Sequence, residues 1–339
     1  MPSTVDPVRA IADAVLYEGY VLWPYRRSAT KNRHRWTFGG IHPRSHSEGR
    51  EDDPWTMQTE CLLEGDAATR VDVRVRFLQV VERQVLARTE GALVPVDELV
   101  VDEDLLLSWD EAREREVAVP DVRPAELDPP RVVAVNFAAG EEEEEVVDAT
   151  GARVGAISRR WRALEGSVEV TSARVGADLF RIRVHIENTT PWAGADREDA
   201  LRQTFASAHT VLRAEGGDFV SLADPPEVLR GEAEACRNEG TWPVPVGEPG
   251  DRGTILSSPI ILEDYPQIAP ESPGDLFDGG EIDGLLTLSI LGLSDEEKRE
   301  MRATDPRTRE ILERTEALSP EELMQLHGRV RELHAVRRP

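Results

Sequence analysis

The stretch GSVEVTSARVGADLFRIRVHIEN, residues 166–188, decides the fold class of this 339-residue chain. Apolar and polar residues alternate on both sides of a short break at 176–178, most regularly from Ile182 to Ile186. Alternation with a period of two is typical of a strand with one buried face, and a break this short joins antiparallel neighbours. The stretch therefore predicts a β-hairpin within an antiparallel sheet.

Strand patterns continue on the N-terminal side of this hairpin. Residues 71–77 alternate valine or phenylalanine with charged residues, and 131–137 is a short apolar run. Five consecutive glutamates at 141–145 predict a solvated hairpin tip, because they lack the alternating ligands and the glycine of a calcium loop. Residues 196–212, by contrast, have helical spacing, with an aspartate in the capping position.

Helix start signals lie at both ends of the chain. Asp6 and Pro7 supply an N-cap and a first-turn proline ahead of apolar residues at helical spacing. Near the other end, residues 294–297 have the spacing of a capping box, and similar start signals follow at 305–306 and 319–322. We expect one N-terminal helix and a group of C-terminal helices.

The domain organisation follows from a change in composition. Residues 241–280 are rich in proline and glycine, which predicts a linker or an extended arm. We therefore expect an α+β protein with a β-rich N-terminal domain over 1–240, built on an antiparallel sheet, and a small helical domain over 281–339.

The composition excludes several functional classes. A formal net charge of −25 argues against nucleic-acid binding and against adhesion to anionic lipid, since both need a basic surface. The chain has no CxxC pair, no GxGxxG or Walker loop for phosphate and no GxSxG elbow. No apolar run reaches the ~20 residues that span a bilayer, and the first 15 residues do not resemble a signal peptide. We expect a cytoplasmic protein with no cofactor and no membrane insertion.

A basic, aromatic segment near the N-terminus is the first candidate binding site. The first 50 residues carry eight Lys/Arg and four Asp/Glu, and three of the four tyrosines lie within 17–38. Arginines beside aromatic rings suit an anionic ligand or an acidic partner, with the rings as anchors. The alternative is that the rings are core and the arginines pair with the protein's own acidic surface. The predicted binding residues are Trp23, Tyr25, Arg26, Arg27, Lys31, Arg33, Arg35 and Trp36.

Two histidines define the second candidate. His42 and His46 are four residues apart, a spacing that on a helix would face one metal ion, and Cys61 or Glu60 would complete such a site. Pro43 and the surrounding glycines and serines favour a flexible polar loop instead. An enzyme of unidentified class, with a site formed by His34, these two histidines and the nearby arginines, is therefore the alternative function.

Two stretches resemble a known group of proteins. They are YEGYVLWPYRRSATKNRHRWTFGGIHP at 17–43 and SPIILEDYPQIAPESPGDLFDGGEIDGLLTLSILGLSDEEKR at 258–299. Both resemble actinobacterial proteins encoded near nickel–iron hydrogenases of the atmospheric-hydrogen type. The resemblance implies an accessory or assembly role, because two isolated cysteines cannot hold the metal centres of hydrogenase subunits. We therefore expect a non-enzymatic interaction protein with a protein partner, which it contacts through 23–38 and 257–282.

Overall fold

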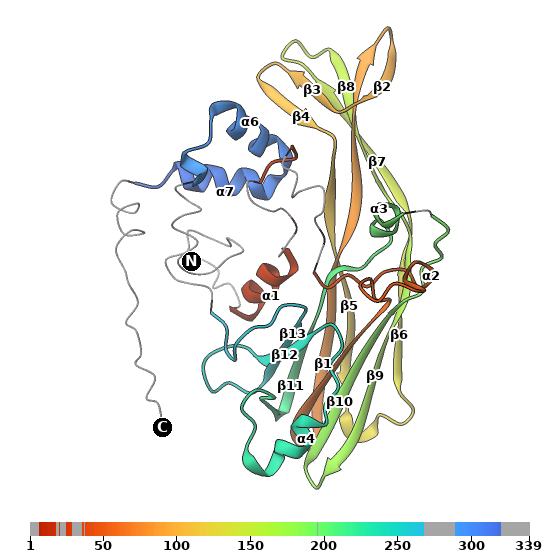
Figure 1. Cartoon of the computed structure of the whole chain (residues 1–339), viewed down its shortest axis with the longest axis vertical. Coiled ribbons are helices and arrows are strands. Elements are labelled where there is room, and N and C mark those ends of the chain that lie inside the picture. Colours follow the sequence, from red (N-terminus) through yellow and green to blue (C-terminus); the bar gives the residue numbers. More distant parts are fainter. Residues whose placement is uncertain are drawn as a thin grey trace.

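A large antiparallel sheet dominates the computed structural model, which describes residues 7–17, 20, 25–28, 36, 38–194, 196–267 and 289–319. Eleven strands join this sheet, in the order β12-β13-β11-β1-β10-β9-β6, with β2, β5 and β8 paired to β1 and β7 paired to β8 (Figure 1). The hairpin β3–β4 forms a separate two-stranded sheet. The predicted α+β class is confirmed.

The strands are β1 (Thr56–Thr89), β2 (Ala92–Val96), β3 (Glu98–Val101), β4 (Asp104–Leu107), β5 (Trp109–Val122), β6 (Arg131–Phe137), β7 (Gly140–Val147), β8 (Arg153–Trp161), β9 (Leu164–Gly176), β10 (Leu179–Asn188), β11 (Ala206–Val220), β12 (Trp242–Pro245) and β13 (Thr254–Ser258). The helices are α1 (Pro7–Tyr17), α2 (Arg44–Ser47), α3 (Arg197–Leu201), α4 (Arg230–Glu234), α6 (Asp295–Thr304) and α7 (Pro306–Glu316). Short 3₁₀ turns lie at Pro124–Glu126 and Glu227–Leu229.

The 34-residue strand β1 organises the sheet. Its first part pairs with β10 and β11, and after a register shift between Gly65 and Arg70 it pairs with β11 and β5, then with β8 and β2. The predicted hairpin is present as β9–β10, and the alternating residues of 71–77 put every apolar side chain in the core. The interior packs rings as well as aliphatic chains, with Phe77 stacked on Phe205 at 4.6 Å between centroids.

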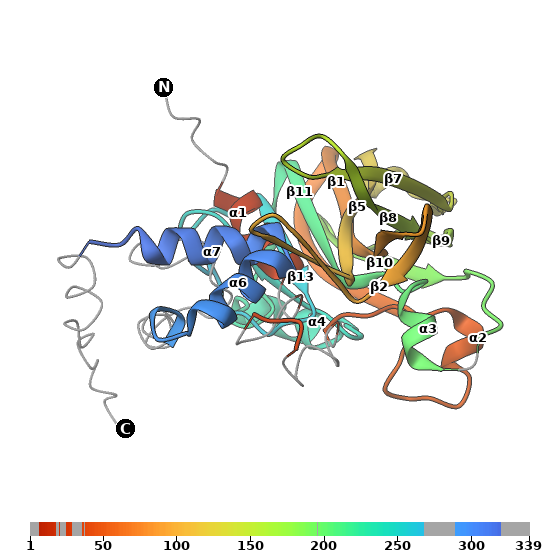
Figure 2. The same cartoon turned by 90° about the horizontal axis from the view of Figure 1, so that it is seen from above.

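The N-terminal helix and the C-terminal helices lie on the same side of the sheet (Figure 2). One apolar cluster joins Leu16 and Tyr17 of α1, Leu78 and Val80 of β1, and residues of α6 and α7. The Tyr20 hydroxyl donates a buried 2.6 Å hydrogen bond to Asp305, the N-cap of α7. The C-terminal helices thus share a core with residues of the 1–240 region. The capping box predicted at 294–297 is present, whereas the start signal at 319–322 lies almost wholly outside the described residues.

Two local predictions are corrected by the strands. The helix predicted over 196–212 is limited to α3, and the chain continues as β11 from Ala206. Residues 206–210 are buried on both faces, so they lack the alternation that distinguishes a strand from a buried helix. The glutamates at 141–145 form strand β7 instead of a hairpin tip. Each of them pairs with an arginine; the arginines are Arg113, Arg153, Arg159 and Arg160.

The region predicted as a linker also contains strands. β12 and β13 lie within 241–280 and extend the large sheet, while 268–280 fall outside the described residues. Pro243 and Pro245 are accommodated because β12 is an edge strand, where a missing backbone N–H costs no ladder hydrogen bond. None of the helices within the described residues is long and apolar enough to cross a membrane.

Candidate functional site

The segment between α1 and the sheet brings two histidines together, His46 within the short helix α2 and His42 just before it. α2 begins directly after Pro43, whose carbonyl accepts hydrogen bonds from the backbone N–H groups of His46 and Ser47 at 2.9 and 3.2 Å. Proline is tolerated at the start of a helix because no intrahelical partner exists there for its missing N–H. The proline that favoured a flexible loop in the sequence therefore precedes an ordered turn.

Both histidine rings face one carboxylate. His42 Nε2 lies 3.1 Å from Asp53 Oδ1, and His46 Nε2 lies 3.0 Å from Asp53 Oδ2. The three residues are only 2%, 1% and 7% exposed. We call His42, His46 and Asp53 the histidine–aspartate group.

The chain after β10 closes over this group. Arg197 of α3 donates from Nε to Asp53 Oδ1 at 3.1 Å, and Thr204 Oγ1 lies 3.0 Å from His42 Nδ1. The ring of Trp192 meets His46 edge to face, with centroids 4.9 Å apart. Figures 1 and 2 both show α2 and α3 side by side.

Hydrogen bonds attach the segment before α2 and the segment after α3 to each other and to the end of β10. Ile41 and Phe205 exchange a pair of 3.0 Å backbone hydrogen bonds. The buried side chain of Asn188 donates to the carbonyls of Ile41 and Gln203, both at 2.8 Å. The histidine–aspartate group is therefore held on a rigid frame.

Burial and charge set the protonation of the group. Burial lowers the pKa of His42 to about 4, although the Asp53 charge opposes this shift. Burial alone would raise the pKa of Asp53, but hydrogen bonding with His46 and the charges around it, including Arg197, hold that pKa below its usual range. At neutral pH the group therefore contains an ionised carboxylate and a neutral His42, which are the forms that bind cations.

Cys61, predicted as a partner of the two histidines, lies elsewhere. Its side chain is fully buried in the apolar core beside Met57 and Leu63, and burial raises the pKa of its thiol. Asp53 takes the place next to the histidines that the sequence analysis assigned to Cys61 or Glu60. In a chain with 65 acidic residues, no sequence signal distinguishes this aspartate from its neighbours.

The described residues of the basic, aromatic segment contact both the large sheet and the C-terminal helices. Tyr25 and Trp36 are buried in the cluster with Leu78 and the C-terminal helices. Arg26 pairs with Glu297 of α6 at 3.0 Å, and Arg27 pairs with Asp97 at 3.3 Å. Trp23, Lys31, Arg33, His34 and Arg35 lie outside the described residues. The described arginines thus pair with the protein's own carboxylates, and a binding role for the set stays a prediction.

A large cleft lies next to this segment. It has a volume of about 1160 Å³ and is bounded by Arg27 and Trp36, the end of β1, the β3–β4 hairpin and α6. Seven carboxylate and four arginine residues line it, above apolar side chains that include Trp109 and Leu107. We call this the acidic cleft.

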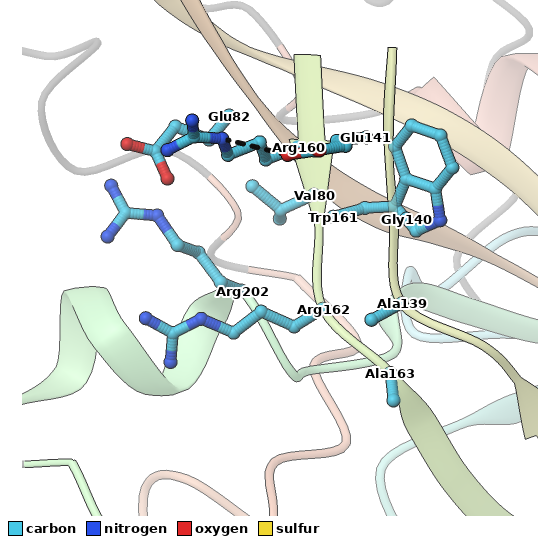
Figure 3. A pocket seen from close by; sticks show the side chains of 10 residues that line it. All are labelled: Val80, Glu82, Ala139, Gly140, Glu141, Arg160, Trp161, Arg162, Ala163 and Arg202. Carbon is cyan, nitrogen blue, oxygen red and sulfur yellow. Dashed lines mark ion pairs between the residues drawn. The ribbon is translucent and has the colours of Figure 1, made fainter. Parts of the chain in front are cut away.

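A second, smaller pocket is shown in Figure 3. It has a volume of about 490 Å³ beside β8, and its side chains include Arg160, Arg162 and Arg202. These arginines are engaged already, since Arg160 pairs with Glu141 at 3.6 Å and Arg162 with Asp199 at 2.6 Å. The pocket therefore offers less free charge than the acidic cleft.

Comparison with models of known protein families gives no match for this chain, and neither does a search of curated proteins. What the chain does must be inferred from its own residues.

Proposed function

We propose that this chain is a non-enzymatic accessory protein that binds a basic segment of a protein partner in the acidic cleft. The observation that carries the proposal is the charge of the cleft, where carboxylates outnumber arginines above an apolar floor. Such a surface attracts lysine and arginine side chains at its rim and buries apolar ones at its centre.

The pairing of the charges supports this choice of partner. Arg27, Arg83 and Arg202 of the cleft each pair with a carboxylate of the protein. Glu98 and Glu296, in contrast, are exposed and form no ion pair with any residue that the structure describes. The fourth arginine, Arg299, is also exposed and has no ion pair with a described residue. Glu82, Glu98 and Glu296 outnumber it, so the uncompensated charge of the cleft is negative. This differs from the anionic ligand that the arginine-rich sequence suggested.

The resemblance to proteins encoded near hydrogenases suggests where the partner belongs. On that basis the partner is a component of a hydrogenase or of its assembly apparatus, and this chain is an assembly factor. The proposal of a basic partner segment does not depend on this assignment.

The test is capture of partners by the full-length tagged protein from its own organism. The bait variant Glu98→Lys/Glu296→Lys reverses two charges of the acidic cleft. A matched control, Glu234→Lys/Glu248→Lys, makes the same change at two exposed glutamates away from it. We expect a stoichiometric partner that the control retains, that the cleft variant loses, and that dissociates as salt screens the charges. Equal capture by both variants would contradict the proposal.

A metal-dependent enzyme is the second candidate, favoured by the convergence of His42, His46 and Asp53 beside Arg197. The three side chains are almost fully buried, so a substrate reaches them only if the segment 189–204 moves. A ligand that binds there would raise the melting temperature by mass action. No shift across a panel of phosphorylated metabolites, with and without added metal, would count against this function.

A further inference from the structure

Three ligand-type side chains from one short stretch of chain converge in the interior. One nitrogen of His42, one nitrogen of His46 and one oxygen of Asp53 lie within 4.8 Å of one another, and all three residues are buried. Neither the acidic cleft nor the proposed partner uses them. They are therefore available for a separate role.

The distances within the group suit a metal ion. Histidine nitrogens and carboxylate oxygens bind zinc at about 2.1 Å in tetrahedral geometry, so two such ligands lie ~3.4 Å apart. The separations of 3.1 Å for His42–Asp53 and 3.0 Å for His46–Asp53 are slightly shorter than this spacing. The group would need little rearrangement to accept an ion.

The contacts behind His42 also suit a metal ligand. When Nε2 of a neutral imidazole binds a metal, Nδ1 carries the proton and needs an acceptor. Thr204 Oγ1 lies 3.0 Å from His42 Nδ1, and its own hydroxyl proton has an acceptor 2.9 Å away in the carbonyl of Ala200. Every polar atom in this chain of contacts then has a partner.

We propose that His42, His46 and Asp53 bind one divalent first-row transition metal ion, such as zinc, which cross-links the two ends of the segment 42–53. Two imidazoles favour such ions over magnesium and calcium, which prefer oxygen ligands. Three protein ligands leave the fourth position of a tetrahedral zinc ion to water, but the near-complete burial of all three residues gives a substrate no access to that position. The ion is therefore assigned a stabilising role, independent of partner binding.

The experiment uses full-length protein with a histidine-free tag, stripped with a chelator and dialysed. Zinc is titrated by calorimetry, and bound metal is measured by mass spectrometry after gel filtration. We expect one zinc per chain and a melting temperature that rises with zinc concentration by mass action. Cobalt, as a probe of ligand geometry, should bind in competition with zinc and give an absorption spectrum.

Matched variants assign the site. His46→Gln and Asp53→Asn should each weaken zinc binding at least 100-fold and abolish the thermal shift. His185→Gln, which alters a half-buried histidine paired with Glu187 on β10, should retain both. Thr204→Val should weaken binding about 10- to 100-fold, as expected for a group that positions a ligand.

Two results would overturn the proposal. If stripped wild-type protein binds no zinc, the histidine–aspartate group is a metal-free hydrogen-bonded network. Circular dichroism shows whether His46→Gln and Asp53→Asn are folded. If both folded variants bind zinc as tightly as the wild type, the ion binds elsewhere. Zinc binding by the stripped wild-type protein is measured without any variant. The proposal is therefore tested even if a variant fails to fold.

Discussion

The histidine–aspartate group and the acidic cleft differ in how far their carboxylates are buried and paired. In the first, the carboxylate of Asp53 is enclosed by two imidazoles and Arg197 and is nearly inaccessible. In the second, Glu98 and Glu296 face solvent with no partner among the described residues. A buried charge without partners would destabilise the fold, whereas an exposed one costs little and remains free to bind. This difference agrees with the two proposals made above, a stabilising role for the first region and a binding role for the second.

The largest expected effect comes from removing the buried carboxylate. Asp53→Ala leaves two buried histidines and Arg197 without their acceptor, so we expect a loss of about 3–5 kcal/mol in the free energy of unfolding. The measurement is urea denaturation in the presence of a chelator, so that only protein contacts are compared. Glu98→Ala in the acidic cleft is the control and should change stability by less than about 0.5 kcal/mol. Equal effects of the two substitutions would remove the distinction between the regions.

The pH dependence of stability provides a second test, at His209, a buried histidine that has no hydrogen bond to a carboxylate. Burial lowers the pKa of His209 on β11 to about 4, with Arg76 adding to the shift and the Ser207 carbonyl opposing it. The unfolded chain, with a histidine pKa of about 6.5, binds this proton first as the pH falls. Stability is therefore lost between about pH 6.5 and pH 4, by up to about 3 kcal/mol from this residue.

The check is the free energy of unfolding of wild type and His209→Gln across this pH range. The variant should show a shallower fall, with a difference of up to one proton bound on unfolding. Parallel curves for the two proteins would mean that His209 titrates alike in both states.

A smaller effect is expected where the C-terminal helices meet the N-terminal segment. Tyr20→Phe removes the hydroxyl that donates to Asp305 and leaves a buried carboxylate oxygen with one bond fewer. We expect a loss of about 1–3 kcal/mol, measured by urea denaturation. An unchanged stability would show that the helices are attached through apolar packing alone.

The smallest expected change in stability comes from removing the N-cap of helix α6. Ser294→Ala removes the side chain that accepts from the backbone N–H of Glu297 at the start of α6, and should cost about 1 kcal/mol. Hydrogen exchange should show faster opening confined to α6. Faster exchange throughout the sheet would contradict a local role for this cap.

The sheet was predictable where one face of a strand meets the core. Residues 71–77 and 182–186 alternate because their polar side chains lie on the opposite face of the sheet from their apolar ones. The same rule failed at Ala206–Thr210, which is buried on both faces, and at 141–145, where paired arginines stabilise a strand of glutamates. Strand β12 was hidden by Pro243 and Pro245, which an edge strand accepts. Strand β13 was hidden by the proline- and glycine-rich sequence around it.

The candidate site was predictable in part. The spacing of His42 and His46 indicated that the two rings could face one point, and the structure brings them together. Asp53, Arg197 and Thr204 could not be selected, because acidic and basic residues are frequent in this chain and the last two join the site only through tertiary folding. Tyr25 and Trp36 stood out by composition, which does not distinguish a buried anchor of the fold from an exposed anchor for a partner.

The most direct test of the proposed partner site is site-specific photo-crosslinking in full-length protein. A photoreactive amino acid replaces Val100, which lines the acidic cleft and is 60% exposed, or Val228, which is 88% exposed near α4. Val228 is the more exposed of the two, so a cross-link from position 100 alone cannot be ascribed to greater accessibility. We expect a cross-link to one partner from position 100 and none from position 228. Cross-links from 228 alone, or equally from both, would contradict the proposal.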